Sequence, residues 1–422
     1  MVSQFRLLEL PSLALKQVFL QFRAVDIFEL SFTSSRVRNI IISARLRAIE
    51  HNVIFVKEYP YIVTVLKRNE EVDEDIFTWK FIGNEKCHSN KTEKKIGCHR
   101  FDKCYKQEST IFCCFHNSEF GLSVIFDYIF KIFRGPVNLD LSLNEIRNIH
   151  ALLLNQNLSR CQTIILDVDF KRNDKTIYED TAEILDLVTI GKALKTEVHQ
   201  NDELDIEKIR NLESVHIIDA HWMSFSTLLS FNCRFGAFVD HKFGPVEITK
   251  FVENWYNSTD KTLVRMRFGW DDRDPFKITE SKLKWEEWDP KRRSRWFFDP
   301  SESFCFNRID CCEGHDVTRP DGLTATILYD EGFVSNVIFL VWHDRFPKEA
   351  RLKTLNRQTA YTDVEINKLE STIPLEPDVE FYTLLAEKSD GFYDRLIERK
   401  AKATAEIKFW QEAEEGGCSS YP

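Results

Sequence analysis

Glycine is scarce in this chain, and the motifs that mark several common enzyme classes are missing. Only 14 of the 422 residues are glycine, whereas a usual share of about 7% would give roughly 30. This scarcity argues against glycine-rich phosphate loops and tight nucleotide cradles. No nucleophile elbow, dinucleotide fingerprint or metalloprotease helix occurs either. The sequence therefore predicts a protein that is not an enzyme and that needs no cofactor.

Long hydrophobic runs are also absent. No stretch approaches the ~18 uncharged apolar residues of a membrane span, and charged residues interrupt the apolar run near the start, which argues against a signal peptide. The eleven cysteines form no small-domain disulfide pattern, so we expect reduced thiols in a cytoplasmic or nuclear protein. The net charge of −10 disfavours nucleic-acid binding, because neutralising phosphates requires a basic surface.

The first fifty residues predict three short amphipathic helices. The first helix repeats apolar residues at helical spacing, namely Leu15, Val18, Phe19 and Phe22. Pro11 suits a helix start, Asp26 is the expected N-cap of the second helix, and Ser34 or Ser35 that of the third. Seven basic and four acidic residues give this segment a net charge of +3. About 40 residues rarely fold without help, so the apolar side chains need a partner or the rest of the chain.

This segment resembles an F-box. The residues that carry the likeness are Leu10, Pro11, Leu15, Val18, Phe19, Asp26, Leu30, Ser31, Ser34, Arg36, Ile40 and Ile41. The segment LPSLALK is especially similar to the corresponding segment of nematode-expanded F-box proteins with a type 2 F-box-associated domain. It departs from the usual pattern at Leu13, where an acidic residue is common. In that family the F-box docks on a Skp-type adaptor, which joins it to a cullin–RING ubiquitin ligase. The resemblance implies adaptor contacts by Leu10, Pro11, Leu15, Val18, Phe19 and Leu30.

Strand patterns follow the helices. Residues 52–57 and 61–67 are expected to form a hairpin, with a third strand at 75–81 and a loop at 84–95. Beyond residue 124, helices and strands alternate. The predicted helices are 124–133, 179–194, 206–212 and 248–256, and the predicted strands are 137–141, 163–168, 214–218, 235–239 and 262–268. The segment Leu212-x-x-Val215-x-Ile217 echoes leucine-rich repeats, which favours a curved α/β stack interrupted between 170 and 212.

The family resemblance extends into this region. The segment ITKFVENWYNSTDKTLVRMRF, with a Phe-x-x-x-Trp helix before a strand, is similar to the type 2 F-box-associated domain, as are EEWDPKRRSRWF and RPDGLTATILYDE. We expect an α/β (α+β) fold in four parts. These are an F-box at 5–50, a strand-rich connection at 51–120, a curved, leucine-rich-repeat-like F-box-associated domain at 121–375, and a C-terminal helical segment at 376–412.

Two clusters are candidate sites of other kinds. Cysteine and histidine crowd into residues 87–116, but no C-x-x-C pair occurs and the gaps fit no common zinc module, so free thiols are the expectation there. The most basic aromatic stretch supplies weak candidates for binding an acidic or phosphorylated target, namely Trp288, Arg292, Arg293 and Arg295. Acidic residues within the same stretch favour local pairing instead. No metal site is predicted.

The function that the resemblance implies is target recognition for a Skp–cullin–F-box ubiquitin ligase. The expected partners are the Skp-type adaptor, the cullin–RING ligase beyond it, and a target protein, without nucleic acid or membrane. Two alternatives stay open. The first is an adaptor-binding protein that delivers no target. The second is a zinc-binding protein, or a zinc-dependent enzyme, that uses the cysteine- and histidine-rich residues 87–116.

Overall fold

The chain divides into two compact units. The first is Met1–Phe243 and the second is Gly244–Pro422. The computed structural model describes residues 10–55, 60–67, 74–82, 92–96, 98–114, 118–143, 148–153, 155–167, 176–197, 204–269, 276–278, 281–298, 308–330 and 335–345, with residue 146 and scattered positions between 355 and 408.

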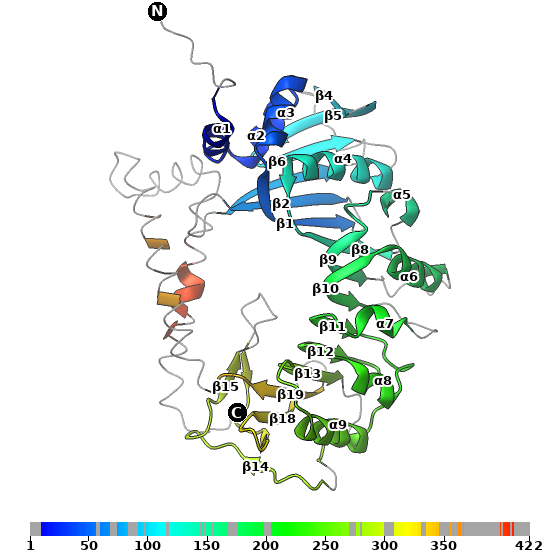
Figure 1. Ribbon diagram of the computed structural model, residues 1–422, viewed down its shortest axis with the longest axis vertical. Coiled ribbons are helices and arrows are strands. Elements are labelled where there is room, and N and C mark those ends of the chain that lie inside the picture. Colours follow the sequence, from blue (N-terminus) through cyan, green and yellow to red (C-terminus); the bar gives the residue numbers. More distant parts are fainter. Residues whose placement is uncertain are drawn as a thin grey trace, which may run out of the picture. The chain divides into compact units, whose positions relative to one another are not determined.

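The three predicted amino-terminal helices are present (Figure 1). They are α1 (Ser12–Phe19), α2 (Ala24–Leu30) and α3 (Ser35–Ser43). Ser34 caps α3, because its side chain accepts a hydrogen bond from the Val37 backbone N–H at 3.1 Å. The N-cap prediction for Asp26 is wrong. The N-cap is Arg23 and helix α2 begins at Ala24, two residues before Asp26. Asp26 therefore lies within the first turn and accepts a hydrogen bond from Arg23 Nε at 2.9 Å.

A strand-rich layer follows without a linker. Strand β1 (Leu46–Phe55) runs across the boundary expected at residue 50 and pairs antiparallel with β2 (Tyr61–Lys67), which confirms the hairpin. Strand β3 (Glu74–Phe81) pairs with β2. The remaining strands of this layer are β4 (Thr92–Ile96), β5 (His99–Gln107) and β6 (Thr110–Cys114), with β6 parallel to β3.

The loop predicted at residues 84–95 is wrong from Thr92 onward, since β4 pairs with β5 there. Its lysine-rich sequence favours a loop in isolation. In the folded chain, however, Lys94 pairs with Glu29 of α2 at 2.7 Å and lies over the Phe32 ring at 4.9 Å. Tertiary contacts therefore stabilise a strand that local preference alone would not.

Strands and helices then alternate. The helices are α4 (Ser118–Ile132), α5 (Ile149–Leu153), α6 (Thr176–Leu187), α7 (Ile206–Ile209) and α8 (Phe225–Ser230). The strands are β7 (Phe133–Arg134), β8 (Val137–Ser142), β9 (Arg160–Asp167), β10 (Thr189–Thr196), β11 (Ser214–Ile217) and β12 (Phe235–Phe238). Neighbours pair in parallel in the order β1–β8–β9–β10–β11–β12, and the helices α5–α8 lie along one side (Figure 1). This confirms the leucine-rich-repeat-like arrangement.

The predicted helix at 179–194 is partly wrong. Helix α6 ends at Leu187, and β10 begins at Thr189. Thr189 and Ile190 are β-branched and pair with β9, which extends the parallel order through the segment where an interruption was expected.

The second unit is built differently. Helix α9 (Pro245–Asn257) precedes β13 (Arg265–Gly269), which pairs antiparallel with β19 (Asn336–Trp342). The sheet continues through β18 (Thr324–Asp330), β17 (His315–Thr318) and β14 (Glu286–Glu287), and β15 (Trp296–Phe298) pairs with β16 (Arg308–Asp310). Of the C-terminal helix predicted at 376–412, residues 397, 400–405, 407 and 408 are described as helical, and Ala403 packs with Leu355 and Trp296.

Candidate functional site

The residues predicted to contact the adaptor separate into two groups. Phe19 is fully buried and Leu15 is 6% exposed, so both pack inward from α1. Val18, Leu10 and Leu30 are half-buried, and Pro11 is exposed. The second group can reach a partner directly, whereas the first can only support α1 from behind.

Two exposed apolar side chains were not among the predicted adaptor contacts. Leu13 on α1 is 76% exposed, and Phe22, just beyond α1, is 40% exposed. Leu13 lies off the helical stripe of Leu15 and Phe19, so periodicity gives no signal for it. The signal was its departure from the usual acidic residue. We call Pro11, Leu13, Val18 and Phe22 the α1 surface.

Helix α2 is anchored in the layer behind it. The Phe28 ring packs against Phe77 and Trp79 of β3 and Tyr128 of α4, with ring centroids 4.8, 5.5 and 5.6 Å away. The Ala24 backbone N–H donates to the Asp75 side chain. These contacts join the three-helix module to the strands, as one body and not as a tethered bundle.

Ion pairs add to this anchor. Lys106 of β5 pairs with Asp26 at 2.6 Å, beside the Lys94–Glu29 pair. Burial alone would raise the pKa of Asp26, but hydrogen bonds from Arg23 and Lys106 outweigh it and hold the pKa below its ordinary value. Asp26 therefore stays ionised and links α2 to β5.

The parallel sheet presents one half-exposed face. Alternate residues of neighbouring strands form two rows across it, Tyr61, Ile54, Asp140, Ile165, Lys195 and His216 in one, and Val63, Asn52, Asn138, Thr163, Ala193 and Ser214 in the other. All twelve are half-buried. The intervening residues, such as Val53 and Ile164 at 0% exposed, form the core on the opposite side. We call these two rows the half-exposed face.

The polar residues of this face are held in place. Asn138 Nδ2 donates to Glu50 Oε2 at 3.1 Å and to Asn52 Oδ1 at 2.9 Å, so the side chains of these three strand residues form a hydrogen-bond network. Burial and the neighbouring charge of Asp167 raise the pKa of Asp140, against the opposing effect of Lys195. The face thus combines fixed hydrogen-bonding groups with aliphatic side chains, a composition suited to a polypeptide partner.

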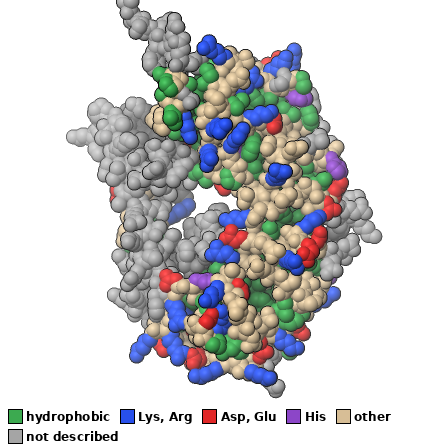
Figure 2. All heavy atoms as spheres, viewed as in Figure 1, with side chains coloured by type: hydrophobic (Ala, Val, Ile, Leu, Met, Phe, Trp, Pro, Cys, Tyr) green, Lys and Arg blue, Asp and Glu red, His purple; other side chains and the backbone are tan. Residues whose placement is uncertain are grey.

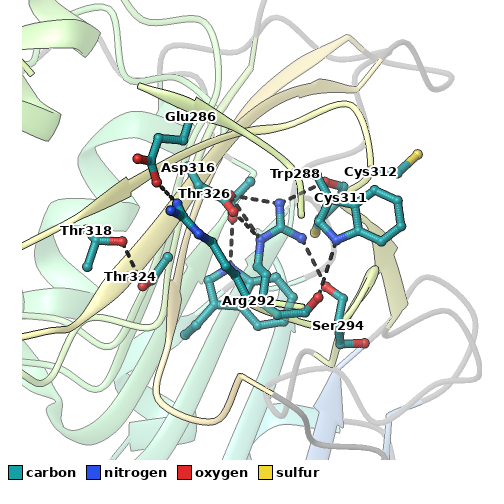
Figure 3. Close-up of polar contacts among 12 residues, drawn as sticks. Glu286, Trp288, Arg292, Ser294, Cys311, Cys312, Asp316, Thr318, Thr324 and Thr326 are labelled. Atoms are coloured by element: carbon teal, nitrogen blue, oxygen red, sulfur yellow. Dashed lines mark hydrogen bonds and ion pairs between the residues drawn. The ribbon is translucent and has the colours of Figure 1, made fainter. Parts of the chain in front are cut away.

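The basic aromatic stretch is used internally (Figure 3). Arg293 is 0% exposed and makes a bidentate ion pair with Asp316, with Nη2 and Oδ1 2.8 Å apart. Its Nη2 also donates to the Cys311 carbonyl at 2.9 Å, and its guanidinium lies 4.8 Å from the Trp342 ring centroid. Arg293 therefore holds the second unit together and offers no surface to a target.

The other three candidates of that stretch are also engaged. Arg292 pairs with Glu286, and Arg295 pairs with Asp310 at 2.6 Å. Trp288 Nε1 donates to the Arg293 carbonyl at 3.3 Å. Burial would raise the pKa of Asp310, but hydrogen bonds from Arg295 and Cys312 keep it lowered. Local pairing, the alternative given above, accounts for these residues.

The cysteine- and histidine-rich segment is only partly described. Among the described residues, no three His, Cys, Asp or Glu side chains lie together as metal ligands require, while Cys87, His88 and His116 lie outside the described part. Cys104 and Cys113 are both buried. Trp79 Nε1 donates to Cys113 Sγ at 3.0 Å, and burial raises the pKa of this thiol. These two cysteines are therefore part of the hydrophobic core.

Comparison with known protein families finds a match for two segments of the chain. Residues 7–48 match the F-box domain, and residues 204–268 match the region described as F-box associated, of type 2. The chain thus carries an F-box domain and, further along, a type 2 F-box-associated region. An F-box domain implies binding to a Skp-type adaptor of a cullin–RING ligase and a role in target recognition, and F-box proteins are generally non-catalytic subunits.

Two relatives match most of the chain. Uncharacterized protein F59B2.8 of Caenorhabditis elegans is 26% identical over 368 residues, which cover 85% of this chain and 82% of that protein. Uncharacterized protein F59B2.9 of the same organism is 26% identical over 387 residues, 89% of this chain and 88% of that protein. No solved structure matches. No described helix is long and apolar enough to cross a membrane.

Proposed function

We propose that this chain is the target-recognition subunit of a Skp–cullin–F-box ubiquitin ligase. The F-box docks on a Skp-type adaptor, and the adaptor connects it to the cullin–RING ligase. The observation that supports the proposal is the difference between two helices of the F-box. Helix α2 packs against the strands that follow it, whereas Leu13 on α1 is 76% exposed. Leu13 is accompanied by exposed Phe22 and Pro11, and several apolar residues exposed around one short helix support a binding surface.

The contribution of such a subunit is proximity. It makes no covalent bond itself. It holds a target protein beside a charged ubiquitin-conjugating enzyme, which raises the effective concentration of the target lysines. The rigid joint between α2 and strands β3 and β5 supports this role, because a fixed geometry restricts where the target can sit. We place the complex in the cytoplasm or nucleus, in keeping with the free thiols of the described cysteines.

Within the F-box, we propose that the α1 surface makes the direct contacts, together with Leu10 and Leu30. Leu15 and Phe19 act from inside by fixing the orientation of α1. This assignment changes the choice of test residue. An aspartate at Phe19 would bury a charge in the core, so loss of binding there would report only unfolding.

For the target, we propose the half-exposed face of the parallel sheet. Its central residues Asn138, Thr163 and Ile165 lie on adjacent strands in register, where backbone hydrogen bonds fix their positions. No catalytic group is needed for this role, and the hydrogen bonds from Asn138 to Glu50 and Asn52 give the face a defined polar pattern.

The adaptor proposal is tested by co-purification. Full-length chains with Leu13→Asp and Val18→Asp are expected to lose the adaptor and cullin while remaining folded. Leu187→Asp is the matched control, because Leu187 on α6 is 38% exposed and lies outside the F-box match. Undiminished recovery of the adaptor with the double variant would overturn the proposal.

Target binding is tested in the same preparations with the proteasome blocked. Thr163→Arg with Ile165→Arg should remove the target proteins while the adaptor and neddylated cullin stay bound, and Leu187→Arg should remove neither. Retention of every captured protein by the double variant would show that the target binds elsewhere. An adaptor complex that lacks neddylated cullin would favour the alternative of a protein that delivers no target.

A further inference from the structure

Two arginines lie side by side at the start of the sheet. Strands β1 and β7 pair in parallel with Arg47 opposite Arg134, and both side chains are exposed. Like charges on directly paired strand positions destabilise the pair. The sequence gives no hint of this contact, since the two residues are far apart along the chain.

The backbone fixes this pair in place. Gly135 follows Arg134, and a Cβ at this glycine would come within 2.8 Å of the Ala48 carbonyl oxygen. Only glycine permits such a close approach. The His51 backbone N–H also donates to the Pro136 carbonyl at 2.8 Å. The two arginines therefore cannot separate without breaking the pairing of β1 and β7.

A third arginine joins them in a strained conformation. Arg45 connects α3 to β1 with φ at +50°, in the left-handed region where a side chain costs roughly 1 kcal/mol or more. Glycine or asparagine would fit this position at lower cost. An exposed arginine at a costly position, next to two others, points to a use for its charge.

The surrounding surface does not neutralise these charges. In the part of the chain that the structure describes, Arg45, Arg47 and Arg134 make no ion pair, whereas Arg23 and the nearby Lys131 pair with Asp26 and Asp127. Lys and Arg side chains gather over the part of the view where the F-box helices and β1–β6 lie, with few acidic side chains between them (Figure 2).

Exposed apolar residues accompany the cations. Two positions after Arg47, Ile49 is 39% exposed, and two positions after Arg134, Pro136 is exposed. Arginine next to apolar residues is typical of protein interfaces, in which lysine and glutamate are depleted. We call Arg45, Arg47, Ile49, Arg134 and Pro136 the arginine patch.

We propose that the arginine patch binds an acidic surface of the Skp-type adaptor and steers the adaptor onto the F-box. The inference rests on the proposed function. Arg45 and Arg47 lie within the F-box match at residues 7–48, so the patch is continuous in sequence with the docking module. The local charge is opposite in sign to the −10 of the whole chain, so the patch attracts an acidic partner although the chain as a whole is acidic. Steering of this kind raises the association rate more than the affinity.

The test compares association rates of the full-length chain with purified Skp-type adaptor. In the variant Arg47→Glu with Arg134→Glu, the association rate constant at an ionic strength of about 0.01 M should fall about tenfold or more. The dissociation rate constant should change by less than about threefold. At about 0.15 M the difference should shrink, because the Debye length is then about 8 Å.

A matched control carries the same change of net charge elsewhere. Lys192 and Arg234 are exposed and both pair with Glu213, at 3.8 and 3.0 Å. Lys192→Glu with Arg234→Glu should leave the association rate within about twofold. Normal adaptor binding with equal rates for the wild type and the Arg47/Arg134 variant would overturn this inference alone. Absence of adaptor binding by the unaltered chain would overturn the proposed function and this inference with it.

Discussion

Lys106 of β5 is paired with Asp26 of α2, with Nζ and Oδ1 2.6 Å apart. This pair joins a helix of the F-box to a strand 80 residues later in the chain. Together with the Phe28 cluster, it makes the F-box and the strand layer one folded body. A docking module of this size could not bury enough surface alone. The chain resolves this by packing α2, and Leu15 and Phe19 of α1, against its own residues, while Leu13 of α1 stays 76% exposed.

The first prediction concerns that joint. Phe28 is 0% exposed, so Phe28→Ala should lower the free energy of unfolding by about 3–5 kcal/mol through the lost transfer energy and the cavity left behind. Chemical denaturation of the free chain measures this. Phe22→Ala removes the same ring from a site that is 40% exposed and should cost below about 1.5 kcal/mol. Equal losses for the two variants would mean that α2 is not anchored by Phe28.

The sequence predicted the local structure well. The apolar spacing of residues 15–22 predicted α1, and the serines at 34 and 35 predicted the cap of α3 to within one residue, because helical periodicity and capping depend on neighbours in the chain. The 61–67 hairpin strand followed from alternation. The errors at β4 and β10 have one cause. Both strands are stabilised by partners distant in sequence, Glu29 for β4 and strand β9 for β10.

The candidate site was harder to predict. The family resemblance correctly identified the F-box, but it could not separate exposed Leu13 from buried Phe19, since burial depends on which face of α1 meets the rest of the chain. Arg293 illustrates the same limit. Its position in a basic, tryptophan-rich stretch suggested a binding surface, while its partner Asp316 lies 23 residues away and becomes its neighbour only through the antiparallel sheet.

The second prediction concerns this buried pair. Asp316→Asn leaves the Arg293 charge without its carboxylate, and breaking a buried ion pair on one side costs about 3–5 kcal/mol. The control is Asp310→Asn. Its partner Arg295 is 19% exposed and Asp310 itself is 34% exposed, so solvent screening limits the loss to about 1 kcal/mol. Denaturation followed by tryptophan fluorescence measures both, and a loss below about 1 kcal/mol for Asp316→Asn would contradict the structural role given to Arg293.

The third prediction concerns the start of α3. Ser34→Ala removes the acceptor of the Val37 N–H hydrogen bond, which should reduce stability by about 1 kcal/mol. Ser35→Ala, one residue inside the helix, should change it by less than about 0.5 kcal/mol. Thermal unfolding of the two variants side by side is sufficient, and a larger loss at Ser35 would show that the cap is assigned to the wrong serine.

The last prediction concerns pH. His51 is 0% exposed on β1, with Nδ1 3.0 Å from Thr64 Oγ1 and Nε2 2.7 Å from the Phe133 carbonyl. Burial lowers the pKa of His51 to about 4, against the opposing effect of the Phe133 hydrogen bond. The unfolded chain, with a histidine pKa near 6.5, therefore binds a proton that the folded chain does not bind between these two values. Stability should fall as pH decreases through this window.

Between pH 7 and pH 5 the loss from His51 should be about 2 kcal/mol. His51→Gln cannot take up this proton, so its free energy of unfolding should depend less on pH by that amount, even though its stability at pH 7 is lower. If wild type and His51→Gln lost stability equally over this range, His51 would have to be protonated in the folded chain, and the burial that places it between β2 and α4 would be wrong.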